Sequence, residues 1–200
     1  MVSAFLGLLV FTTTKKTPNA KAVASSYSMR AGSSSSRPSS APGPPGGQTP
    51  YLYHLYKHDR LSAISALTVS PKRRRLALYL RVRARNLTGL DVRSFLRHLL
   101  QHLRGPVALL WDRGPIHRRR EVQVFPRERP RVQWEYFPAY APELNPAEYV
   151  WTQTDAALSN TAPQDLVDLR ARLRSSIRRT RSSQTLLWAC INASDLPSPR

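Results

Sequence analysis

Two acidic residues follow predicted strands, at positions where an open α/β sheet can bring side chains together. Asp112 is the first polar residue after the apolar run Val107–Trp111, which is typical of a strand covered on both faces. Glu148 follows the apolar and aromatic run Val132–Phe137 and lies in the first turn of a predicted helix. Because such sheets place their chemistry beyond the carboxyl ends of strands, we expect the two carboxylates to meet there.

Paired carboxylates are suited to holding divalent cations. Cleaving and rejoining a phosphodiester requires an activated water or 3′-hydroxyl and a stabilised leaving oxygen, and two divalent ions about 4 Å apart supply both. Mg²⁺ prefers hard oxygen ligands, retains several waters and needs only one or two carboxylates per ion. Asp112 and Glu148 are therefore the candidate catalytic and metal-binding residues.

A proline-rich turn is predicted to position Glu148. The segment Tyr136–Trp151 contains three prolines, each of which fixes its own φ and restricts the residue before it. Asn145 is the predicted helix N-cap, Pro146 the first helical residue and Glu148 the third. A simpler interpretation is that Glu148 only completes a capping box with Asn145, and the two roles are compatible.

The pattern around these residues resembles the DDE transposase and integrase superfamily, and most closely the bacterial insertion-sequence transposases related to mariner elements. The resemblance rests on a strand ending in Asp112, on His117 five residues later, and on the block Pro-x-Tyr-x-Pro-x-Leu-Asn-Pro-x-Glu-x-x-Trp that ends at Trp151. It extends from about Gly47 to the C-terminus. It implies an α/β, ribonuclease H-like fold, in which helices flank a mixed sheet.

In intact relatives three carboxylates hold two Mg²⁺ (or Mn²⁺) ions, and this site implies a DDE-type transposase or endonuclease. By the resemblance, Asp112 matches the second carboxylate and Glu148 the third. His117, Asn145 and Pro146 are implied as supporting residues. The implied function is DNA transposition by metal-dependent phosphodiester cleavage and strand transfer.

The first carboxylate of this pattern has no counterpart in the sequence. Relatives carry it on the first, central strand of the sheet, ahead of the segment that begins here at Gly47. The first acidic residue of this chain is Asp59, which could substitute only if the first strand were rebuilt. We therefore expect a first strand that is missing or replaced, through truncation or an altered reading frame, and impaired catalysis.

The N-terminal quarter differs in composition from the rest. Residues 1–50 are predicted to be a low-complexity, disordered segment, and 51–200 an incomplete ribonuclease H-like domain. Ala31–Pro50 in particular is rich in Ser, Pro and Gly and has no apolar period. Met1–Thr14 is apolar but too short for a membrane-spanning helix, and its lysines follow the apolar core, unlike those of a secretory signal. The simpler interpretation is a buried strand, which could occupy the vacated central position.

The remaining elements follow from hydrophobic periodicity. Besides the two strands described above, the sequence predicts strands at Tyr51–Tyr56, Arg60–Ser70 and Leu76–Arg83, and helices at Asp91–Leu103, Pro115–Phe125, from Pro163 onward and at Gln184–Asn192. His98 and His102 lie four residues apart on the first helix. Because no third ligand is evident, we interpret this pair as part of a solvated face and not as a zinc site.

A formal net charge of +19 predicts a polyanionic partner. The resemblance identifies it as DNA, the transposon ends and the target, and leaves a homodimer open. Candidate phosphate contacts are Arg118, Arg119, Arg120, Lys72, Arg73 and Arg74. The single cysteine, Cys190, excludes an internal disulfide and suits a reducing compartment, so we expect a cytoplasmic protein without a membrane segment.

Two alternatives remain open at this point. The chain could be a non-catalytic, basic nucleic-acid-binding remnant of a transposase, whose binding weakens steeply with salt and ignores Mg²⁺. It could also be a decayed reading frame whose product does not fold, which would show no cooperative melting transition.

Overall fold

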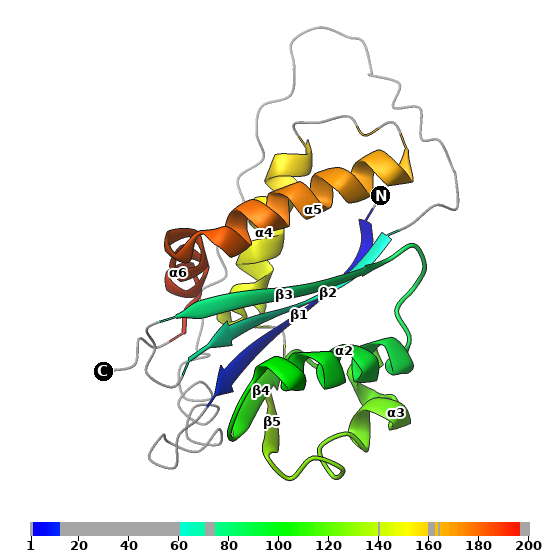
Figure 1. The fold of residues 1–200 in the computed structure, drawn as a ribbon, viewed down its shortest axis with the longest axis vertical. Coiled ribbons are helices and arrows are strands. Elements are labelled where there is room, and N and C mark those ends of the chain that lie inside the picture. The colour runs from blue at the N-terminus through cyan, green and yellow to red at the C-terminus, as the bar shows by residue number, and fades with distance from the viewer. Residues whose placement is uncertain are drawn as a thin grey trace, which may run out of the picture.

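The structure is a computed structural model that describes residues 2–12, 61–70, 75–139, 141–159, 163 and 165–196. A five-stranded mixed sheet forms its centre, and helices cover both faces of the sheet (Figure 1). The predicted α/β fold with a mixed sheet flanked by helices is confirmed.

The strands lie in the order β3-β2-β1-β4-β5. Their bounds are Val2–Thr12 (β1), Leu61–Val69 (β2), Leu76–Arg83 (β3), Val107–Trp111 (β4) and Val132–Tyr136 (β5). Strands β2 and β4 are buried along their whole length, and for β4 the continuous apolar run predicts this burial. In β3, which lies at the edge, Leu76, Leu78 and Val82 are buried and the other residues are partly exposed. The prediction for Tyr51–Tyr56 falls outside the described residues.

Strand β1 occupies the centre of the sheet. It runs parallel to β2, with Leu9 opposite Leu67, and antiparallel to β4, with Leu8 opposite Trp111. Leu8 and Leu9 have no solvent exposure. The central strand therefore comes from within residues 1–50, as the buried-strand interpretation of Met1–Thr14 predicts. The disorder predicted for Ala31–Pro50 falls outside the described residues.

The helices form one layer on each face of the sheet (Figure 1). Their bounds are Gly89–His102 (α2), Arg120–Gln123 (α3), Pro146–Ser159 (α4), Leu166–Ser182 (α5) and Gln184–Ala193 (α6). Helices α2 and α3 pack with Leu8 of the central strand in one hydrophobic cluster. Helices α4, α5 and α6 pack with Leu9 in the other. Because successive residues of a strand point to opposite faces, β1 contributes to both cores.

The amphipathic patterns of α2 and α5 correctly predict their buried sides. Phe95, Leu96 and Leu99 of α2 are buried, whereas His98 and His102 are exposed, as expected of a solvated face. Leu169, Leu173 and Ile177 form the buried side of α5. No helix in the described ranges is both long enough and apolar enough to cross a membrane.

Two helix predictions are wrong in their extent. The predicted helix Pro115–Phe125 is broken into a 3-10 turn, Pro115–Arg118, and α3, because Arg119 between them has an extended backbone (φ −62°, ψ 138°). The helix expected from Pro163 begins only at Leu166. There Asp165 is the N-cap, and its carboxylate accepts a hydrogen bond from the N–H of Asp168 at 2.7 Å.

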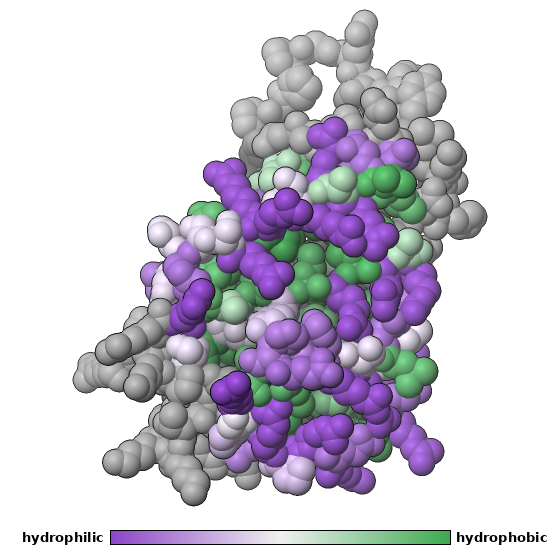
Figure 2. Space-filling view, viewed as in Figure 1, coloured by the Kyte–Doolittle hydropathy of each residue, from purple (hydrophilic) through white to green (hydrophobic). Residues whose placement is uncertain are grey.

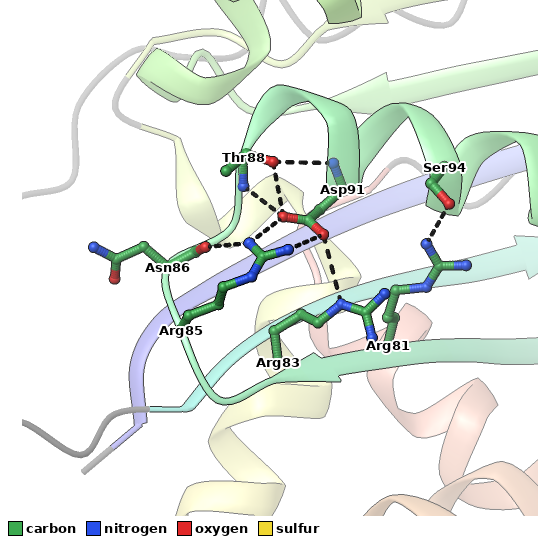
Figure 3. Close-up of polar contacts among 7 residues, drawn as sticks. All are labelled: Arg81, Arg83, Arg85, Asn86, Thr88, Asp91 and Ser94. Atoms are coloured by element: carbon green, nitrogen blue, oxygen red, sulfur yellow. Dashed lines mark hydrogen bonds and ion pairs between the residues drawn. The ribbon is translucent and has the colours of Figure 1, made fainter.

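A buried carboxylate, Asp91, links the start of α2 to the end of β3 through contacts with arginines (Figure 3). Thr88 and Asp91 form a capping box, in which each side chain accepts a hydrogen bond from the backbone N–H of the other. Asp91 also accepts two hydrogen bonds from the guanidinium of Arg85, at 2.6 and 2.9 Å, and lies 3.5 Å from the Nε of Arg83. The hydrogen bonds from Arg85 hold the pKa of the Asp91 carboxyl well below its usual range.

Replacing Asp91 by asparagine is expected to lower the free energy of unfolding by about 2 kcal/mol at pH 7, because charge-assisted hydrogen bonds in a buried setting are lost. The folded pKa lies below the unfolded value of about 3.9, so this stabilisation is present above about pH 4 and is lost as the pH falls through the folded pKa. Urea unfolding at pH 7 and pH 3 measures it. If Asp91→Asn lost the same free energy of unfolding at both pH values, the stabilisation would not come from the ion pairs of Asp91. Glu143→Gln, at an exposed position, serves as the control.

Candidate active site

A tight turn fixes Asp112 just beyond the carboxyl end of β4. The Oδ1 atom of Asp112 accepts a hydrogen bond from the N–H of Gly114 at 2.9 Å, as in an Asx turn. A Cβ atom at position 114 would lie 3.0 Å from this oxygen, so the close approach favours glycine. Sequence reasoning missed Gly114, although its Asp-x-Gly pattern is a recognisable turn signal.

His117 is the second contact of the same carboxylate oxygen. Its Nε2 lies 2.8 Å from Oδ1 of Asp112, and its imidazole has no solvent exposure. The ring packs against Trp111, with the ring centroids 4.0 Å apart. The side-chain amide of Gln123 donates hydrogen bonds to the carbonyl of His117 and to the hydroxyl of Tyr136, at 2.6 and 2.8 Å. His117, a predicted supporting residue, thus contacts Asp112. Gln123 and Tyr136 help to hold His117 in place, and no pattern in the sequence indicated this role for them.

The Asp112 carboxyl is held in its charged form. Burial raises its pKa, but the contacts with His117 and the N–H of Gly114 outweigh burial, so the pKa lies below its usual value. The side chain is 45% exposed. Its other oxygen, Oδ2, makes no hydrogen bond with any residue in the described ranges. One oxygen therefore fixes the carboxylate in place while the other remains accessible.

Glu148 lies in the first turn of α4, as predicted. Pro146 is the first residue of the helix, and Oδ1 of Asn145 accepts a hydrogen bond from the N–H of Ala147 at 3.2 Å. The backbone N–H of Asn145 donates to the carbonyl of Pro142 at 2.9 Å. The side-chain amide of Asn145 donates a hydrogen bond to Oε1 of Glu148 at 3.4 Å. This contact is compatible both with the simpler interpretation of Glu148 as a partner of Asn145 and with a role as a metal ligand.

Asp112 and Glu148 line the same cavity, which has a volume of about 410 Å³. Burial, together with the nearby negative charge of Asp112, raises the pKa of the Glu148 carboxyl. The two carboxylates repel one another in a half-buried cavity, and a bound cation would reduce this repulsion. Arg113 and Arg118 also line this cavity, and the Nε of Arg113 donates to the carbonyl of Phe137 at 3.3 Å.

Of the other predicted basic contacts, the structure describes Arg119 and Arg120. Arg119 and Arg120 are exposed at the start of α3 but are not part of the cavity lining. Lys72, Arg73 and Arg74 fall outside the described residues. Arg113 was missed, because nothing in its sequence position except its place next to Asp112 distinguishes it from the many other arginines.

The donor set at this cavity fits one divalent cation. Mg²⁺ binds through one or two carboxylates and completes its coordination with water, and the half-buried cavity has room for both. Within the described ranges, no group of three or more His, Cys, Asp or Glu side chains could hold a metal ion. The described residues therefore do not form a site in which three carboxylates share two ions. Asp59 is not among the described residues.

A comparison with known protein families identifies the family of this chain. The family of DDE superfamily endonucleases matches residues 32–170, which is more than half of the chain. No curated protein matches it. The matched segment includes Asp112, His117 and Glu148. Of the described strands only β1 lies outside it, and most of α5 and all of α6 also lie beyond its end.

Proposed function

Because the chain belongs to the DDE superfamily of endonucleases, we propose that it is a DNA-binding domain that holds one divalent cation between Asp112 and Glu148. Members of this family act on DNA with the help of divalent metal ions. The observation that carries the proposal is that the two carboxylates, distant in sequence, line one cavity and interact electrostatically. Mg²⁺ and Mn²⁺ are the ions that suit such oxygen ligands.

The residues around the cavity have separate roles in this proposal. His117 and Gly114 fix one oxygen of Asp112 and leave Oδ2 as the metal ligand. Helix α4 presents Glu148 from its rigid first turn. A bound cation would polarise an oxygen of the phosphodiester and make a water bound to it more acidic. Arg118, at the cavity wall, supplies a guanidinium suited to a phosphate oxygen.

We further propose that strand cleavage and strand transfer are impaired. The two-ion chemistry draws on three carboxylates in intact relatives, whereas among the described residues two acidic side chains, Asp112 and Glu148, line this cavity. No third carboxylate joins Asp112 and Glu148 within the described residues, and this supports a second candidate function, a nucleic-acid-binding protein without catalysis. The two candidates differ in whether metal-dependent cleavage occurs at all.

Nicking of supercoiled plasmid DNA in Mg²⁺ or Mn²⁺ separates the two candidates. For a residual endonuclease, the wild-type protein nicks at least about tenfold faster than Asp112→Asn and Glu148→Gln, because loss of metal-site contacts typically costs 10- to 100-fold. The exposed Glu143→Gln is the matched control and retains the wild-type rate. If the wild type and both cavity variants nick no faster than a protein-free sample, the non-catalytic function is correct.

A further inference from the structure

Helix α5 carries a stripe of arginines on its exposed side. Arg170, Arg174, Arg178 and Arg181 are all exposed and follow one another at steps of four, four and three residues. Since residues three and four apart lie on the same side of a helix, these four form one line, here called the α5 arginine stripe. Hydrophilic side chains gather along α5 on the face of the molecule shown in Figure 2.

Within the described ranges, no ion pair balances the charge of the α5 arginine stripe. Arginines of the described ranges do form ion pairs elsewhere, including Arg172 with Asp168 on the flank of the same helix, but none involves the stripe. Like charges at this spacing each destabilise a helix by a few tenths of a kcal/mol. An extended polyanion lying along the helix would remove that repulsion.

The length of the stripe and the burial of the apolar side of α5 indicate which kind of polyanion would suit it. At 1.5 Å per residue the stripe is about 16 Å long, which corresponds to about five base pairs of duplex DNA. An amphipathic helix that lies on an anionic membrane needs an accessible apolar side. The apolar side of α5, with Leu169, Leu173 and Ile177, is instead buried against the protein. The stripe therefore suits a phosphate backbone better than a lipid surface.

We propose that the α5 arginine stripe binds the phosphate backbone of double-stranded DNA. This inference rests on the proposed function for DNA as the partner, but it adds a contact surface separate from the metal-binding cavity. Three of the four arginines lie beyond residue 170, where the family match ends, so the match does not assign this surface. Phosphate contacts of this kind add affinity and orientation without reading the sequence.

The test is the salt dependence of binding to a random-sequence DNA duplex, measured by fluorescence anisotropy in EDTA. The variant Arg170→Gln, Arg174→Gln, Arg178→Gln, Arg181→Gln keeps good helix formers while removing four charges. The matched control replaces the exposed Arg97, Arg104, Arg127 and Arg129 by Gln. Since each lost phosphate contact reduces the slope of log K against log salt by about 0.9, the stripe variant should lose about 3 to 4 units and the control less than one.

Equal losses in the two variants would overturn the proposal, because net charge alone would then explain binding. The proposal would also be overturned if the stripe variant kept the wild-type salt dependence of DNA binding but no longer bound phosphatidylserine vesicles. Melting curves confirm that both variants are folded. EDTA removes any divalent cation, so the result is independent of the metal site. A stripe variant that keeps the wild-type slope contradicts this inference whether or not the protein binds Mn²⁺ in a separate titration, so failure of the metal proposal is recognised separately.

Discussion

Replacing Leu9 by aspartate is expected to unfold the whole domain. Leu9 has no solvent exposure and lies on the central strand between β2 and β4, facing α4, α5 and α6. Removing a buried leucine costs about 2 to 5 kcal/mol, and burying an unpaired charge costs several more. The sum is comparable with the total stability of about 5 to 15 kcal/mol of a typical domain. Thermal unfolding followed by circular dichroism should show no cooperative transition.

The matched control is Leu90→Asp, since Leu90 is 62% exposed on α2 and should tolerate the same change. A cooperative transition in the wild type and in Leu90→Asp would also exclude the decayed, non-folding reading frame. If Leu9→Asp melted like the wild type, residues 2–12 would not be the central strand.

Replacing Gly7 by aspartate is expected to strengthen metal binding. The antiparallel pairing of β1 with β4 ends with Leu8 opposite Trp111, and extending its register by one residue would bring Gly7 opposite Asp112. By alternation, position 7 belongs to the face of Leu9, the face on which α4 packs. A third carboxylate there should increase the affinity for Mn²⁺ at least about tenfold, the amount that a single supporting residue contributes to many metal sites. Titration calorimetry measures this affinity, and the nicking assay its consequence.

Gly7→Asn is the control, because it matches aspartate in shape and lacks the charge. An equal rise in affinity for asparagine and aspartate would argue against a carboxylate ligand at this position. If Gly7→Asp folded but bound Mn²⁺ no better than the wild type, β1 would not present position 7 to the cavity.

Much of the fold could be predicted from the sequence because its patterns are local. The apolar run ending before Asp112 and the alternation of Leu76–Arg83 predict β4 and β3 at the observed residues. The periodic apolar stripe predicts α2 to within two residues. The turn with Asn145 and Pro146 likewise places Glu148 in the first turn of α4.

What the sequence could not predict depends on long-range pairing. A strand buried on both faces has no polar alternation, so the apolar run of β1 carries no information about its direction or register. The antiparallel pairing of β1 with β4, and hence the position of Gly7, follows only from the assembled sheet. The contact of Gln123 with Tyr136 and the break at Arg119 are of the same kind, because each depends on how the segment after β4 packs.

The central claim, that Asp112 and Glu148 share one cation, is tested most directly by Mn²⁺ titration calorimetry of the folded protein. The wild type is predicted to bind one Mn²⁺ per chain. Asp112→Asn and Glu148→Gln should each weaken binding at least tenfold, while Glu143→Gln should not. Wild-type affinity in both cavity variants, or no binding by the wild type, would contradict the claim.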